Sequence, residues 1–318
     1  MIILADGIDI TAYTGGLSWK NTILELATTM SFETAKTNMQ YMNMYKPSVG
    51  SIINLITNAE IFRGIVITVD DGDEKVNRYT VTDFGWYLNK SKETYQFNQM
   101  PAYKALRKVC EDFNIQIDTI PQLEAPITKI YFDKTISDII SDILDTASRV
   151  SMNFDVTPSG LRIYFIGDII AYPQFRLSQN THLIYSPTAY GGKSHDLSIS
   201  DLKNSIKVIT EKDEVVTVKT VLRDEGSISK FGLLQDVIKI DPEKENAATV
   251  GKQKLDELNR VTESFSIEII EAIDSYTRAG SVLSIDNGQL TVDNYLIEGS
   301  AHSISNDIHK VKLDLRKI

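Results

Sequence analysis

The histidines are the first candidates for chemistry in this sequence. His182, His195, His302 and His309 show neither H-x-x-x-H nor H-E-x-x-H spacing, and Cys110 is the only cysteine that could join them at a metal. His302 and His309 bracket a turn, so we expect them to face each other across a hairpin. Two ligands do not make a metal site. The sequence therefore predicts no metal centre.

Catalytic motifs are also missing. Ser227 and Lys230 match S-x-x-K, but the companion motifs S-D-N and K-T-G are absent, and we expect a loop there rather than a helix. No G-x-S-x-G, P-loop or G-x-G-x-x-G occurs. The acidic run Asp70–Glu74 lacks the residue order of a calcium loop and is typical of a hairpin turn. Since 43 acidic residues guarantee some carboxylate pairs in any fold, no pair is informative. We expect no catalytic residue and no cofactor.

The clearest helical periodicity lies between Met100 and Ile166. Two apolar stripes recur there at the i, i+3, i+4, i+7 spacing of an amphipathic helix. Pro101 fits the first turn of the first helix, and Thr135 with Asp138 begins the second as a capping-box-like pair. The stripes are Ala102, Ala105, Leu106, Val109, Cys110 and Phe113, then Ile136, Ile139, Ile140, Ile143, Leu144, Ala147 and Val150.

Short strands follow each of these helices. Ile115–Ile117 and Ile127–Phe132 have strand character, and Phe154–Ile166 forms a hairpin around a Pro-Ser-Gly turn. We therefore define residues 97–168 as an α/β insert of two helix–strand units. Cys110 lies on the apolar stripe, so we expect a core residue rather than a reactive thiol.

Residues 1–96 are rich in strand patterns. Leu24–Phe32 alternates apolar and polar side chains, and Ile52–Ile56, Ile61–Val69 and Asn77–Phe84 follow with turns between them. Together with Thr94–Phe97 they predict a small antiparallel barrel or sandwich.

The segment Glu33–Pro47 has neither helical nor strand periodicity. A loop of this length in a compact domain is typically a binding segment, and apolar side chains on it indicate an interface. The candidate interface residues are Met39, Tyr41, Met42, Met44 and Tyr45.

Residues 169–318 contain a connector and a second β module with one helix. Ile169–Asn204 is rich in Tyr, Ser, Gly and Asn, and Asn246 is the expected N-cap of a helix that runs to Val261. Asn287-Gly288 is a strong hairpin signal. The predicted fold class is α+β, mainly β, with two small antiparallel β-barrel modules flanking a central α/β module.

Charge and hydropathy exclude several classes of protein. The 318 residues carry a net charge of −10 at pH 7, which argues against specific nucleic-acid binding because such binding needs clustered Lys and Arg. The apolar run at the start is too short for a signal peptide, and no run of about eighteen apolar residues occurs. We expect a soluble protein without a membrane anchor, made in the bacterial cytoplasm.

The order of these parts resembles the hub proteins of contractile phage-tail baseplates, the XkdQ/YqbQ type related to late-control D proteins. The resemblance covers nearly the whole chain and contains no catalytic signature. Its sharpest stretches are Phe62-Arg63-Gly64, Tyr95-Gln96-Phe97, Lys230-Phe231-Gly232-Leu233-Leu234-Gln235 and Glu245-Asn246-Ala247-Ala248-Thr249-Val250.

The resemblance implies a homotrimer whose two β modules per chain give a ring of six similar units. Such a ring meets a hexameric tail tube on one side and a trimeric central spike on the other, with other baseplate proteins around it. An infectious phage and a headless R-type bacteriocin fit equally well. Many longer hubs carry an appended peptidoglycan-cleaving domain, and we expect none here because the last predicted strand lies close to Ile318. The alternative is a cell-wall-binding or peptidoglycan-cleaving tail component.

Overall fold

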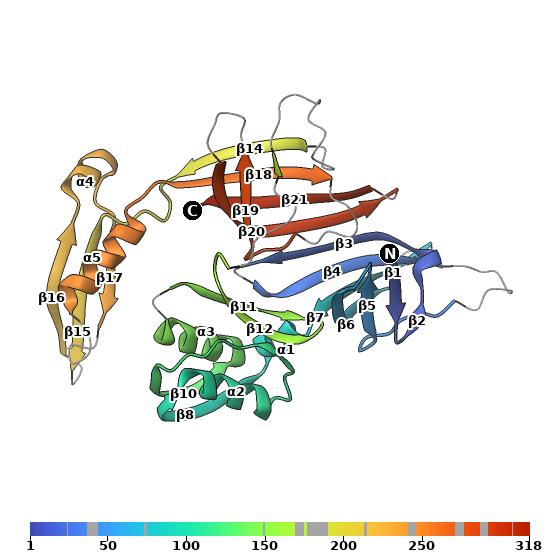
Figure 1. Ribbon diagram of the computed structural model, residues 1–318, viewed down its shortest axis with the longest axis horizontal. Helices are drawn as coiled ribbons and strands as arrows, with labels where there is room; N and C mark the ends of the chain where they lie inside the picture. Colours follow the sequence, from blue (N-terminus) through green and yellow to red (C-terminus); the bar gives the residue numbers. More distant parts are fainter. Residues whose placement is uncertain are drawn as a thin grey trace. The chain divides into compact units, whose positions relative to one another are not determined.

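A computed structural model gives the fold of two compact units (Figure 1). One unit comprises residues 1–194 and 266–318, and the other comprises residues 195–265. Strands predominate over helices, which confirms the mainly β, α+β fold class. The module boundaries expected after residues 96 and 168 stay predictions. The structure describes residues 1–23, 25–36, 44–72, 75–148, 150–168, 175–176, 190–212, 215–240, 246–270, 277–286, 292–306 and 308–318.

The first strands of the larger unit form an antiparallel array. Alternating side chains of neighbouring strands, among them Trp19, Met30, Phe32 and Tyr79, are buried in one core. The predicted loop Glu33–Pro47 begins later than expected, because strand pairing continues through Ala35. The elements are β1 (Ile2–Ala5), β2 (Ile8–Asp9), η1 (Thr11–Tyr13), β3 (Thr14–Thr22), β4 (Glu25–Ala35), β5 (Ile52–Ile56), β6 (Glu60–Asp70) and β7 (Val76–Asp83).

The insert contains both predicted helices. The Thr135 hydroxyl accepts from the backbone of Asp138, as its capping pattern predicted, and Cys110 is buried. Val150 was wrongly placed on the second stripe, since that helix ends at Ala147 and Val150 is exposed. The elements of the insert and of the segment that leads into it are α1 (Gly85–Lys90), β8 (Lys92–Pro101), α2 (Ala102–Asp112), β9 (Ile117–Thr119), β10 (Pro126–Thr135), α3 (Ile136–Ala147), β11 (Met152–Thr157) and β12 (Gly160–Phe165).

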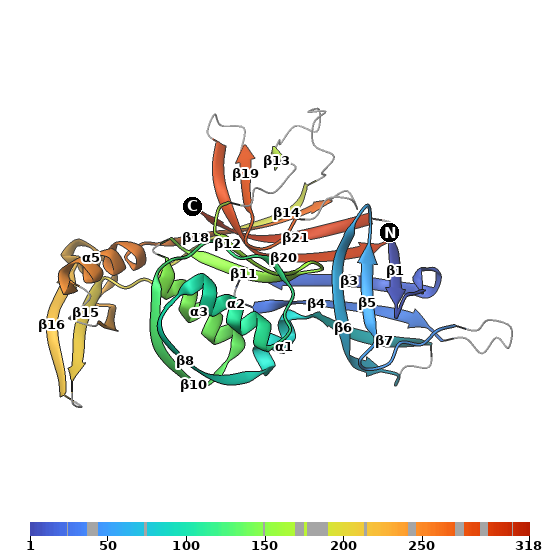
Figure 2. The ribbon, with the colours of Figure 1, turned by 60° about the horizontal axis from the view of Figure 1, so that its bottom comes forward.

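The last strands of the larger unit continue the sheet of the first strands. β20 pairs antiparallel with β3, with His302 opposite Trp19, so the order runs β14-β18-β21-β20-β3-β4-β7-β6-β5-β1-β2 (Figure 2). The predicted turn Asn287-Gly288 lies outside the described residues. The elements are β13 (Phe175–Arg176), β14 (Tyr190–Ser198), β18 (Thr262–Ile270), β19 (Val282–Asp286), β20 (Val292–Ser305) and β21 (Ile308–Lys317).

The smaller unit is a three-stranded sheet with one covering helix. Ala247 and Leu258 of helix α5 pack against the buried Ile206. The Asn246 side chain caps the N-terminus of this helix, as predicted. Val261 was wrongly placed on the packed face, because the helix ends at Leu258 and Val261 is exposed. The elements are β15 (Ser205–Lys212), β16 (Val215–Arg223), α4 (Glu225–Phe231), β17 (Gln235–Lys239) and α5 (Ala247–Leu258).

Two further observations bear on the sequence predictions. Ser227 and Lys230, expected in a loop, lie in helix α4, whose N-cap Asp224 accepts from the backbone of Ser227. Within the ranges given above, every helix is too short or too polar to cross a membrane.

Candidate functional site: a polar junction in the larger unit

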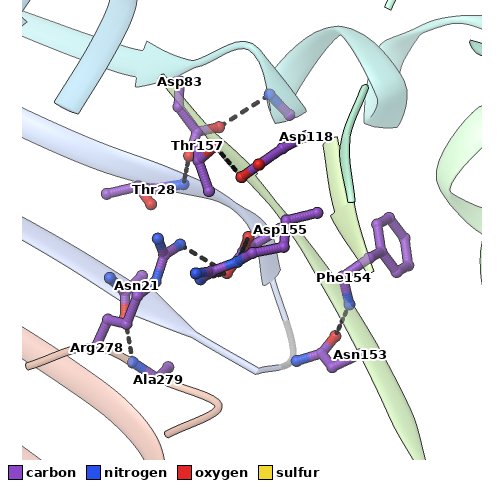
Figure 3. A network of polar contacts seen from close by, with 12 residues as sticks. Asn21, Thr28, Asp83, Asp118, Asn153, Phe154, Asp155, Thr157, Arg278 and Ala279 are labelled. Atoms are coloured by element: carbon purple, nitrogen blue, oxygen red, sulfur yellow. Dashed lines mark hydrogen bonds and ion pairs between the residues drawn. The ribbon is translucent and has the colours of Figure 1, made fainter. Parts of the chain in front are cut away.

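A polar cavity of about 230 Å³ lies where the first strands, the insert and the segment before β19 meet. Its walls include Asn21 and Thr28 from β3 and β4, Asn153 and Asp155 from β11, and Arg278. Figure 3 shows these side chains converging from separate strands. The junction therefore joins parts of the chain that are far apart in sequence.

Asp155 is the centre of the junction. Its carboxylate is almost fully buried and lies 2.8 Å from Arg162 Nη2 and 2.9 Å from Arg278 Nη2 (Figure 3). Arg162 Nε also donates to it over 3.1 Å, which makes that pair bidentate. Asp155 and Arg162 belong to the insert hairpin, whereas Arg278 precedes β19. One carboxylate thus neutralises two cations and holds the insert to the C-terminal strands.

Asn21 ties β3 to the same segment. Its Oδ1 accepts from the backbone N–H of Ala279 over 2.8 Å and from the Ser300 hydroxyl over 3.0 Å. Asn21 is buried, and its Nδ2 faces no hydrogen-bond partner in the part of the chain that the structure describes. A water molecule in the cavity would satisfy such a donor. Arg278 and Ala279 are therefore held from two sides, by the insert and by β3.

Asp83 forms a second buried contact between β4 and α1. Thr28 N–H donates to Oδ2 over 2.8 Å and Gly85 N–H to Oδ1 over 2.9 Å, so both oxygens accept from backbone (Figure 3). Burial raises the pKa of Asp83 to about 6, against the lowering effect of these hydrogen bonds. The carboxylate orders the turn that leads from the first strands into the insert.

The histidine pair lies on the C-terminal side of the junction. His302 Nδ1 is 3.0 Å from His309 Nε2, as the hairpin prediction required, and His302 Nε2 is 3.0 Å from Ser300 Oγ. The Trp19 ring stacks on His302 with centroids 4.6 Å apart. Burial lowers the pKa of His302 to about 3. No group of three potential metal ligands occurs among the residues described.

Close approaches of neighbouring atoms explain two glycines of the larger unit without any chemistry. A Cβ at Gly280, where φ is +86°, would lie 2.1 Å from the Tyr164 hydroxyl. A Cβ at Gly64 would lie 2.3 Å from the Thr82 carbonyl oxygen, while its neighbour Arg63 pairs with Glu60. The Phe62-Arg63-Gly64 stretch therefore has a packing role between β6 and β7.

The predicted interface segment is described only in part. Met39, Tyr41 and Met42 lie outside the described residues. Met44 is half-buried, and the Tyr45 hydroxyl donates to Asp6 Oδ2 over 2.6 Å while the ring packs against the N-terminal core. The end of the segment is thus attached to β1 and β2, and the interface role of all five residues stays a prediction.

Sequence reasoning missed the junction because its partners are distant. A signal existed for one pair, since the predicted hairpin turn at 158–160 places Asp155 opposite Arg162. Arg278 and Asn21 carry no such signal, because neither belongs to a motif or to a local pairing. The predicted site residues and the observed junction do not overlap.

The fold is that of phage and prophage tail proteins. The 43 kDa tail protein of prophage MuSo2 from Shewanella oneidensis superposes with a TM-score of 0.71, covering 99% of this chain and 96% of that protein at 13% identity.

The chain belongs to the YqbQ-like family, whose model matches residues 17–316. It is 24% identical to YqbQ of Bacillus subtilis strain 168 over 265 residues, which is 80% of this chain and 77% of YqbQ. The phage-like element PBSX protein XkdQ of the same organism is 26% identical over 183 residues, 55% of this chain and 52% of XkdQ. The predicted resemblance to the XkdQ/YqbQ type is confirmed, whereas the baseplate hub role stays a prediction.

Proposed function

We propose that this protein is a structural component of a phage tail or tail-like particle, and within it the hub of a contractile baseplate. Three chains form a ring that joins the hexameric tail tube to the trimeric central spike. Membership of the YqbQ-like family and the tail-protein fold support this proposal. The phage-like element PBSX, to which XkdQ belongs, is consistent with it.

The observation that carries the proposal is the pairing of β3 with β20. Five residue pairs, from Gly299 opposite Thr22 to Ser303 opposite Ser18, join the first and last strands of the chain in one sheet. In this proposal the first strands and the last strands act as two β modules and offer two comparable surfaces. Three such chains present six modules to a six-fold partner and keep three-fold symmetry for a three-fold partner.

The first experiment is the mass of the full chain in solution. A trimer has about 107 kDa, three times the 35.7 kDa of one chain. We expect this mass either for the chain alone or after mixing with the spike protein of the same particle, measured by native mass spectrometry across a concentration series. A mass of one chain under both conditions contradicts the ring.

The second experiment tests the segment Glu33–Pro47 as a contact between components. We expect its peptides to gain protection from hydrogen exchange on assembly, because its Met and Tyr side chains leave water there. Met42→Asp should weaken assembly, whereas Asn38→Asp adds the same charge to the same segment at a polar position and should not. Equal exchange in free and assembled protein contradicts this contact.

The peptidoglycan-cleaving alternative makes a different prediction. Retaining glycosidases need two carboxylates at a cleft, whereas Asp155 is held by two arginines and Asp83 by two backbone N–H groups. A turbidity assay on purified cell walls decides between the two functions. Clearing of the walls by the full chain would favour the alternative.

A further inference from the structure

The buried histidine pair sits at the joint between the first and last strands. His302 lies directly opposite Trp19 where β20 pairs with β3, and His309 reaches it from β21. Both imidazoles are only 2% exposed. Trp19 covers the pair, stacking on His302 and lying 5.2 Å from the His309 ring centroid. Two titratable groups are thus enclosed at this joint.

The hydrogen bonds around the pair assign its protons. Ala279 N–H donates to Asn21 Oδ1, which fixes the orientation of the Asn21 amide. The Ser300 hydroxyl donates its only proton to the same oxygen. Ser300 Oγ must therefore accept from His302 Nε2–H. A neutral imidazole carries one N–H, so His302 Nδ1 accepts from His309 Nε2–H. The chain of donors runs in one direction from His309 to Asn21.

An added proton breaks this order. Protonated His302 carries a hydrogen on Nδ1, which then points at the N–H of His309 over a 3.0 Å separation. On balance the surroundings disfavour the new charge. The hydrogen bond to the Thr277 backbone favours it, but burial, His309 on β21 and the cationic Arg278 outweigh that contact, and Trp19 on β3 and Ser300 on β20 do not titrate near neutral pH. The lowered pKa of His302 follows from this burial and these neighbours.

We propose that Trp19, His302 and His309 form an acid-sensitive switch, in which protonation of the histidine pair weakens the β3–β20 pairing that joins the two β modules. The chain of hydrogen bonds that starts at His309 ends on Asn21, which also binds the backbone of Ala279. Loss of these hydrogen bonds therefore also loosens the segment at residues 278–279 that holds the insert. This proposal does not depend on the hub function.

Hydrogen exchange of the full chain between pH 7.5 and pH 5.0, corrected for intrinsic rates, tests the switch. The strands β15 and β16 of the smaller unit contain no histidine and serve as the internal reference. We expect protection of β3 and β20, relative to that reference, to fall about tenfold per pH unit below about pH 6.5, because each opening binds one proton more than the closed state.

Variants separate the switch from a merely structural role. In His302→Gln the amide replaces the donor to Ser300 without titrating, so the pH slope at β3 and β20 should vanish. His309→Gln, available if the first variant does not fold, should reduce the pH slope, because its carbonyl can accept from protonated His302 and so raises the folded pKa of His302 towards its value in the opened state. Ser18→Ala lies on the same pairing without a titratable group and should keep the wild-type slope. A wild-type slope of zero, or one retained in both histidine variants, overturns the proposal.

Discussion

Asp155→Asn is the sharpest test of the junction. The substitution keeps the shape of the side chain but removes the negative charge that pairs with both Arg162 and Arg278. The side chains involved are 10%, 25% and 12% exposed, so water replaces little of the lost interaction. Two cations would then share a buried site without the carboxylate that pairs with both of them.

The expected magnitude follows from the geometry. At an effective dielectric constant of about 20, unit charges at the observed 2.8 and 2.9 Å attract by about 6 kcal/mol each. Repulsion between the arginines and the desolvation of all three groups offset much of this attraction. Removal of one partner from a buried ion pair typically costs about 3–5 kcal/mol. For a unit of this size, in which 1 kcal/mol shifts Tm by about 2–4 °C, that lowers Tm by roughly 6–20 °C.

Scanning calorimetry of the full chain is the assay. We expect Asp155→Asn to lower the transition of the larger unit and to leave that of the smaller unit in place. Asp133→Asn is the matched control, since its ion pair with Lys92 is exposed and such pairs contribute less than about 1 kcal/mol. Equal, small effects of the two substitutions would refute the assignment of Asp155 as the centre of the junction.

Three further predictions concern other buried groups. Leu258→Asp places a charge against the core of the smaller unit and should lower the stability of that unit by on the order of 3 kcal/mol. Lys252 is exposed, so Lys252→Glu should change the stability by less than about 0.5 kcal/mol. Urea unfolding of the two variants measures both effects. Cys110, whose pKa burial raises to about 12, should react with a thiol reagent only at the rate of unfolding, and fast labelling of the native protein would contradict its place in the core. Asp83 should titrate near pH 6 in a carboxyl ¹³C NMR experiment. This folded pKa exceeds the usual value of 3.8, so between the two values the folded state binds a proton that the unfolded state releases, and the stability that Asp83 contributes is lost as pH rises through this window. The pH dependence from His302 has the opposite sign.

Local patterns in the sequence were sufficient for the long elements. Helices α2 and α3 follow from their apolar stripes, and the caps at Thr135 and Asn246 follow from short-range hydrogen bonding between residues three apart. The short helices α1 and α4 escaped prediction, because six or seven residues show too few turns for a periodic stripe.

Long-range contacts were beyond the sequence patterns. The pairing of His302 with Trp19 and of Asp155 with Arg278 depends on how the two ends of the chain meet, which no local spacing records. The hairpin contact between His302 and His309 was predictable because only a turn separates them. The contacts of the candidate site could therefore be predicted from the sequence only where the two partners belong to the same hairpin.

The way the chain enters and leaves the smaller unit has an evolutionary consequence. The chain enters it along β14 and returns along β18, and these two strands are neighbours in the sheet of the larger unit. At the base of the unit, Lys203 N–H donates to the Leu258 carbonyl over 3.2 Å, so both chain crossings lie close together. A segment with adjacent ends and its own core can be exchanged for a short turn, or for a different domain, without breaking the strands on either side. Relatives with shorter or longer segments at this position would then share the sheet and differ in what they display.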